Sequence, residues 1–82
     1  MSASEPAPTH PIPLATIRRR QLLTQRALAQ KAGVTQATLV SLELGKATPR
    51  IQTMYKIASA LQVDPLDITE FNRAIEGPPN PT

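Results

Sequence analysis

The chain has 82 residues, a formal net charge of +3, 40% hydrophobic residues and no cysteine. A chain of this length holds one small core, since it buries only ~60% of its unfolded surface on folding, and without cysteine it has neither disulfides nor thiolate metal sites. It also lacks a signal-peptide pattern and any apolar run near the ~20 residues that cross a bilayer, so we expect a cytoplasmic protein with no membrane association.

Proline divides the chain into three parts. Of the nine prolines, only Pro49 and Pro65 lie well inside the sequence, and the other seven lie near its two ends. Polar segments rich in proline bury too little apolar surface to fold on their own. We therefore expect a flexible arm over residues 1–13, a folded domain over residues 14–76 and a disordered tail over residues 77–82.

The first half of the domain predicts two short helices. Pro13 is tolerated just before a first helical turn, and the apolar spacing after it indicates a helix over residues 14–22. Thr24 is a suitable N-cap for a second helix over residues 25–32. Gly33 should end this helix, because glycine readily adopts the left-handed backbone of a tight exit.

Three further helices are expected in the second half. A third is predicted over residues 36–44 and a fourth over residues 51–61, followed by a fifth that Asp64 caps and that reaches at least Phe71. The fourth helix should bury Ile51, Met54, Ile57, Ala58 and Leu61. Since no segment alternates apolar and polar residues as a strand does, the predicted fold class is all-α with five short helices.

Charge is distributed unevenly along the domain. Between residues 18 and 56 there are eight basic residues and one acid, Glu43, whereas from Asp64 onward four acids accompany Arg73. A basic body is the electrostatic footprint expected of a nucleic-acid-binding protein. A solvated basic surface would have the same composition, so charge alone leaves both interpretations open.

The helices over residues 25–32 and 36–44 have the lengths of a helix-turn-helix motif, with the turn at Gly33. Thr35 can cap the second helix, which would bury one apolar face and leave the opposite face free to enter a major groove. This outer face carries Gln36, Ala37, Val40 and Ser41. Many helical bundles contain a helix-glycine-helix pattern, so the pattern is not decisive by itself.

A longer set of residues in one register extends this motif. The set comprises Leu23-Thr24-Gln25, Leu28-Ala29, Ala32-Gly33-Val34-Thr35, Leu39, Glu43, Gly45-Lys46, Pro49, Thr53, Lys56-Ile57-Ala58, Ala60-Leu61 and Val63. With these residues the chain resembles the Cro and phage-repressor (XRE-type) helix-turn-helix family over about residues 14–71. The resemblance implies a lambda-repressor-like bundle of five helices in which the third is the recognition helix.

The resemblance also assigns contacts with DNA by position. Gln25 matches a glutamine that holds a phosphate together with the helix N-terminus, and Gln36 matches the first base-contacting residue, which can pair bidentately with adenine. Ala37 and Val40 would contact only a thymine methyl, and Ser41 offers a permissive hydrogen bond. The other implied phosphate contacts are Thr35, Thr38, Lys46 and Arg50.

Arg18 and Glu43 match a pair that ties the first helix to the end of the third. Such a pair would set the orientation of the recognition helix more than the stability. The alternative is that Glu43 is a surface acid beside Lys46. The chain departs from the family at Leu22, where glycine is frequent, and at Ala37, which is not a polar reader.

The residue inventory argues against an enzyme. The single histidine, His10, lies in the predicted arm, and there is neither a cysteine nor a glycine-rich phosphate loop. We therefore expect no catalytic residue, cofactor or metal. Tyr55 and Phe71 are expected to be core or dimer contacts, because two aromatics so far apart do not make a base-stacking surface.

The predicted function is that of a small transcriptional regulator, a repressor, that binds double-stranded DNA sequence-specifically. A homodimer would place two recognition helices about one DNA turn apart, and we expect it to form through Leu66, Phe71 and Ile75. The first alternative is a DNA-binding antitoxin with a toxin partner. The second is a helical module that serves only protein interactions.

Overall fold

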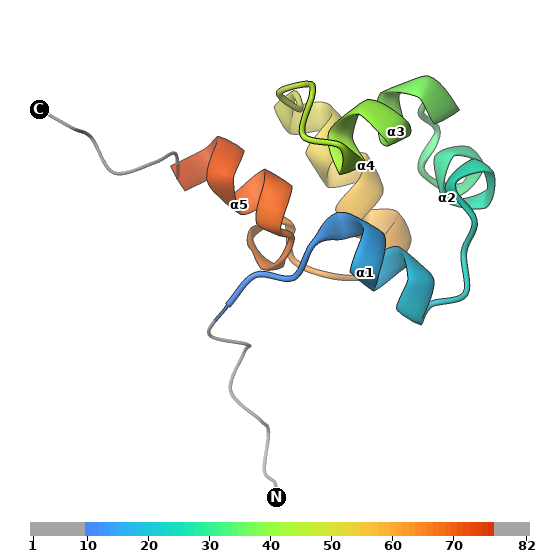
Figure 1. Ribbon diagram of the computed structural model, residues 1–82, viewed down its shortest axis with the longest axis horizontal. Helices are drawn as coiled ribbons and strands as arrows, with labels where there is room; N and C mark the ends of the chain where they lie inside the picture. Colours follow the sequence, from blue (N-terminus) through green and yellow to red (C-terminus); the bar gives the residue numbers. More distant parts are fainter. Residues whose placement is uncertain (1–9, 77–82) are drawn as a thin grey trace, which may run out of the picture.

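The computed structural model describes residues 10–76 and shows helices packed around one core (Figure 1). The elements are α1 (Leu14–Arg20), α2 (Gln25–Ala32), α3 (Gln36–Glu43), α4 (Ile51–Leu61), the 3-10 turn η1 (Pro65–Asp67) and α5 (Thr69–Glu76). Among these residues the only β-type pairing is an isolated bridge between Ile12 and Ile68. The predicted all-α fold with five helices is confirmed. The predicted tail, residues 77–82, lies outside the described residues.

The helices α1 to α4 end in the same way. After each, one residue takes a left-handed backbone, and its N–H and that of the following residue donate to carbonyls of the last turn, which is the Schellman arrangement. The left-handed residues are Leu22, Gly33, Gly45 and Gln62, with φ between 59° and 75°. At α1, the Leu22 N–H donates to the Arg19 carbonyl at 2.9 Å and the Leu23 N–H donates to the Arg18 carbonyl at 3.1 Å.

The predicted end of the first helix at Leu22 is wrong by two residues. The helix ends at Arg20, and Leu22 has a φ of 62° with its side chain 92% exposed. A left-handed backbone is costly for a residue with a Cβ and is not helical. The apolar character of Leu22 therefore gives a false helical signal, and the glycine that is frequent here in the resembling family has a direct conformational reason.

The fifth helix begins later than the sequence predicts. Asp64 does cap a turn, since its Oδ1 accepts the Leu66 N–H at 2.8 Å, but this turn is the short η1. Ile68 then has extended backbone, with φ −102° and ψ 123°, and α5 starts only at Thr69. The interruption exists because Ile68 pairs with the chain that precedes α1.

Ile12 attaches the segment before α1 to the body. Its N–H donates to the Asp67 carbonyl and its carbonyl accepts the Thr69 N–H, both at 2.9 Å. The side chain of Ile12 also packs against the core. Of the predicted arm, residues 10–13 are therefore held at this end by backbone pairing, while residues 1–9 lie outside the described residues.

The core contains residues from every α-helix and from the segment between η1 and α5. Its buried members are Leu14, Ile17, Leu28, Ala29, Ala32, Leu39, Leu42, Met54, Ile57, Ala58, Ala60, Leu61, Ile68 and Phe71. Two assignments from the sequence need correction. Helical spacing places Ile51 in the core, but it is 65% exposed. Phe71, expected to be a core or dimer contact, is a fully buried core residue, so its assignment to the dimer interface is wrong. Ile51 occupies the first position of α4.

No helix in the described part of the chain has the length and apolar character to cross a membrane. Residues 10–76 also contain no group of three or more metal-ligating His, Asp or Glu side chains.

Candidate nucleic-acid interface

The turn between α2 and α3 is built by Gly33 and Thr35. Gly33 has φ 75° and ψ 33°, and a Cβ added to it would meet nothing within 4 Å, so backbone conformation rather than space favours glycine. The Val34 N–H then donates to the Ala29 carbonyl at 3.0 Å. Thr35 Oγ1 accepts the Thr38 N–H at 3.1 Å and caps α3. The predicted stop at Gly33 and cap at Thr35 are confirmed.

The α3 helix has one buried and one outward face. Leu39 and Leu42 are buried against the core. The candidate readers fall at positions i, i+1, i+4 and i+5, which share one side of a helix. Gln36 and Ala37 are exposed, and Val40 and Ser41 are half-buried. The first turn of α3 is therefore the most accessible part of this face.

Arg18 and Glu43 join α1 to the last turn of α3, which is the pairing that the family resemblance implies. Arg18 Nε donates to Glu43 Oε2 at 2.6 Å, and Arg18 Nη2 donates to Glu43 Oε1 at 3.1 Å. The remaining Arg18 nitrogen, Nη1, donates to the Leu23 carbonyl at 2.8 Å. Both side chains are nearly buried, with 9% and 6% exposure. The bidentate geometry fixes direction as well as distance.

The network holds Glu43 in its ionised form. Burial acts to raise the pKa of Glu43, but hydrogen bonds from Arg18 and Gln25 and the positive charges of Arg18 and Arg19 outweigh burial, so the pKa lies below its ordinary value of 4.5. A carboxylate in this position stays charged at neutral pH and can accept all three N–H groups that reach it.

Gln25 joins the same network from the start of α2. Its Nε2 donates to Glu43 Oε1 at 3.0 Å, which links the first residue of α2 to the last residue of α3. The amide has a second N–H and an acceptor oxygen. The cap of α2 is formed separately, because Thr24 Oγ1 accepts the Ala27 N–H at 3.0 Å. The contact between Gln25 and Glu43 restrains the glutamine that the resemblance assigns to a phosphate.

The other candidate phosphate contacts lie near the two ends of α3. Thr35 and Thr38 are exposed at its start, where the Thr35 hydroxyl donates to Thr38 Oγ1 at 2.8 Å. Lys46 and Arg50 are exposed in the loop between α3 and α4. Within residues 10–76 neither cation is in an ion pair. The structure thus leaves polar and cationic side chains at the two ends of the outward-facing helix.

The family comparison agrees with this architecture. A helix-turn-helix family model of the Cro/C1 (XRE) type matches residues 14–68, which is more than half of the chain and runs from α1 through η1. The chain belongs to this family. It contains a helix-turn-helix DNA-binding domain, as the sequence predicts.

One curated relative of the helix-turn-helix domain is the "Uncharacterized HTH-type transcriptional regulator y4dJ" of Sinorhizobium fredii (strain NBRC 101917 / NGR234). The two chains are 37% identical over 54 residues, which are 66% of this chain and 70% of the relative. No solved structure matches the chain.

Two features of this domain do not follow from the sequence. The first is the contact between Gln25 and Glu43, which are far apart in sequence. It depends on the packing of α2 beside α3, and the sequence pattern does not show that packing. The second is the exposure of Ile51 and Tyr55 on α4. Helical spacing identifies an apolar face, but it does not show which end of that face the core covers.

Proposed function

We propose that the helix-turn-helix domain binds double-stranded DNA sequence-specifically and represses transcription by occupying its site. The observation that carries the proposal is the outward face of α3, held by the buried pair of Arg18 and Glu43. Because this pair connects α3 to α1 at a bidentate contact, the reading face has one orientation relative to the body. A rigid reading face is what discrimination between base pairs requires.

Base readout is assigned to the accessible side of α3. Gln36 supplies both an amide N–H and a carbonyl oxygen, the pair that matches adenine in the major groove. Ala37 and Val40 present methyl groups suited to the thymine methyl, and the Ser41 hydroxyl can donate or accept. Gln36 is therefore the residue with the most directional readout.

Backbone positioning is assigned to side chains around α3. The proposed phosphate contacts are Gln25, Thr35, Thr38, Lys46 and Arg50. Among them, Lys46 and Arg50 carry charge, and both are exposed in the same loop. Phosphate contacts of this kind fix register on the duplex without reading its sequence.

A homodimer would let two α3 helices read two half-sites about one DNA turn apart. Leu66 and Ile75 are 38% and 50% exposed and are available for such pairing, whereas the buried Phe71 is not. Sedimentation should therefore show a dimer when the protein is bound to a two-half-site DNA. A monomer on a single half-site would contradict this part of the proposal.

The proposal is tested by selecting bound sequences from a random DNA pool and titrating salt on the selected site. Selection should yield a defined motif. Since Lys46 and Arg50 are the two cationic contacts proposed, each domain should contribute about −2 to the slope of log K against log salt concentration. Binding that is undetectable, or flat with salt, would contradict the proposal and favour a module that serves only protein interactions.

A further inference from the structure

The outward face of α3 continues one residue beyond the helix, to Leu44. This residue is the C-cap of α3, with φ −85° and ψ −5°, and its N–H donates to the Val40 carbonyl at 3.0 Å. Because its backbone is still helical, Leu44 follows Val40 by four residues and Ala37 by seven, which are spacings of one helix side. Leu44 therefore lies on the side of the candidate readers, opposite the buried Leu39 and Leu42.

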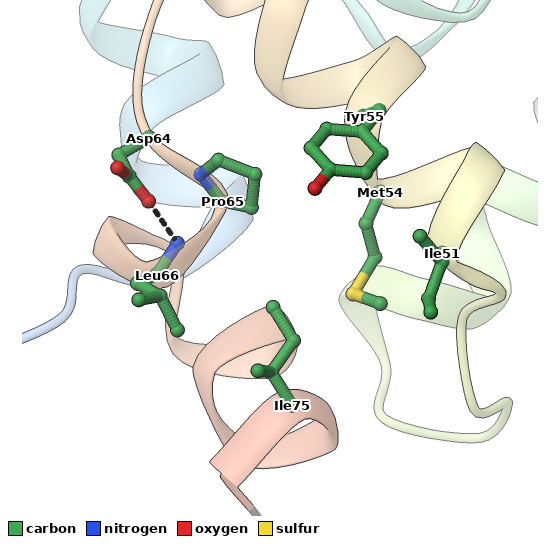
Figure 2. A pocket seen from close by; sticks show the side chains of 7 residues that line it. All are labelled: Ile51, Met54, Tyr55, Asp64, Pro65, Leu66 and Ile75. Carbon is green, nitrogen blue, oxygen red and sulfur yellow. Dashed lines mark hydrogen bonds between the residues drawn. The ribbon is translucent and has the colours of Figure 1, made fainter.

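Leu44 differs in its surroundings from most exposed apolar residues of the chain. Six large hydrophobic side chains are exposed in residues 10–76, and four of them line one hollow between α4 and the segment from η1 through α5 (Figure 2). These four are Ile51, Tyr55, Leu66 and Ile75. Leu44 is 62% exposed and does not line that hollow. Its exposure therefore belongs to the proposed DNA-reading face and not to the face proposed for pairing.

Ala37, Val40 and Leu44 form an apolar strip along the outward face of α3. Neighbouring members are three and four residues apart, so their side chains are adjacent on the helix surface. A single exposed leucine needs no explanation, but a contiguous apolar strip on a binding face indicates apolar contact with the partner. Leu44 has the longest side chain of the three and, with Ala37, is exposed, whereas Val40 is half-buried.

The chemistry of the major groove identifies what such a strip can contact. The apolar group that base edges present there is the C5 methyl of thymine. Against any other base edge, a leucine would cover polar groups without forming a hydrogen bond, which is unfavourable. We propose that Leu44 is a further specificity-determining residue, which selects a T·A pair by packing against the thymine methyl. The inference rests on the proposed function, since it requires α3 to lie in the major groove.

The length of α3 limits where this thymine lies. Leu44 follows Gln36 by eight residues, or ~12 Å along a helix that rises ~1.5 Å per residue. Base pairs along DNA are ~3.4 Å apart. The thymine that Leu44 contacts should therefore lie within about four base pairs of the adenine assigned to Gln36, in each half-site.

The test replaces each thymine of the selected site in turn by deoxyuridine, which lacks only the C5 methyl, and measures binding of the native chain and of Leu44→Ala. In the native chain, one replacement within this distance should weaken binding ~4-fold per half-site, the factor for about one buried methyl group. On the unmodified site, Leu44→Ala should bind about tenfold more weakly, as expected for covering the exposed part of a leucine side chain. Leu44→Ala should be insensitive to deoxyuridine at that same position, because the methyl has lost its partner.

Two controls separate this contact from effects on the fold. Leu22→Ala removes a leucine that is 92% exposed and lies outside α3, so it should keep the affinity and the deoxyuridine profile of the native chain. Leu44 is not a member of the core, so Leu44→Ala should keep the urea midpoint of the native chain.

The outcomes distinguish the inference from the proposed function. If the native chain binds its site specifically but Leu44→Ala has the same affinity, or the same deoxyuridine profile at a uniformly lower affinity, only the inference is overturned. A uniform loss would indicate contact with the sugar-phosphate backbone in place of a base. Absence of sequence-specific binding by the native chain would overturn both.

Discussion

Removing the carboxylate of Glu43 should lower the free energy of unfolding by about 3–4 kcal/mol. Removal of one partner of a buried ion pair typically costs ~3–5 kcal/mol, because the other charge is left uncompensated. Glu43→Ala deletes two hydrogen bonds from Arg18 and one from Gln25. It leaves a guanidinium in a nearly buried site. The bond from Arg18 to the Leu23 carbonyl remains and limits the loss.

Urea unfolding followed by circular dichroism measures this loss. A domain this small has a stability near the lower end of ~5–15 kcal/mol, so the variant should be partly unfolded without denaturant and is best measured in an osmolyte that favours the folded state. Glu76→Ala, which removes an exposed carboxylate on α5, is the control and should change stability by less than ~0.5 kcal/mol.

Replacing both partners separates the effect of an uncompensated charge from the effect of the pair itself. Arg18→Met with Glu43→Leu should recover the stability to within ~1 kcal/mol, because neither charge is then buried alone. The double variant should still bind its DNA site less selectively, since α3 has lost the bidentate contact that orients it. A loss below ~1 kcal/mol for Glu43→Ala, which is typical of an exposed pair, would show that Arg18 and Glu43 do not act as a buried pair.

Three further predictions follow from local geometry. The pKa of Glu43 is lower in the folded state than its ordinary value of 4.5, so ionised Glu43 stabilises the fold above that value. This contribution to the free energy of unfolding should be lost as the pH falls from 4.5 through the folded-state pKa. Urea unfolding at a series of pH values should show this loss in the native chain and not in Glu43→Gln. Leu22→Gly should raise the free energy of unfolding by ~1 kcal/mol, because glycine adopts the left-handed backbone of this position without strain. The control Gln30→Gly, within α2, should lower it by ~1 kcal/mol. A lower free energy of unfolding for Leu22→Gly would contradict this prediction. Glu70 Oε1 accepts the Leu14 N–H at 2.9 Å at the start of α1, and Glu70→Ala should cost ~1–2 kcal/mol in the same assay while Glu70→Gln keeps most of that bond.

The sequence predicts the features that depend on local chemistry. Thr24 and Thr35 cap their helices because a hydroxyl before an apolar run finds an N–H three residues later. Gly33 ends α2 through a backbone that glycine adopts without strain. The pair of Arg18 and Glu43 is not local, and it is predicted only because the chain resembles a family in which these positions meet.

Features that depend on long-range packing are predicted less well. The pairing of Ile12 with Ile68 joins distant segments by backbone bonds that any residue except proline can make, and it delays the start of α5. Phe71 and Ile51 are both apolar residues at helical spacing, yet one is buried and the other exposed. The position of a neighbouring element decides which apolar residue is covered, and spacing within one helix does not contain that information.

Readout of DNA sequence by the outer face of α3 can be measured with Gln36→Ala on the selected site and on single-base variants of it. Gln36→Ala should weaken binding to the selected site by ~1–3 kcal/mol and relax discrimination at one base pair. Gln30→Ala, an exposed glutamine of α2, should change neither quantity, and Gln25→Ala should weaken all sequences about equally. An equal loss on every sequence for Gln36→Ala would contradict the proposed orientation of α3.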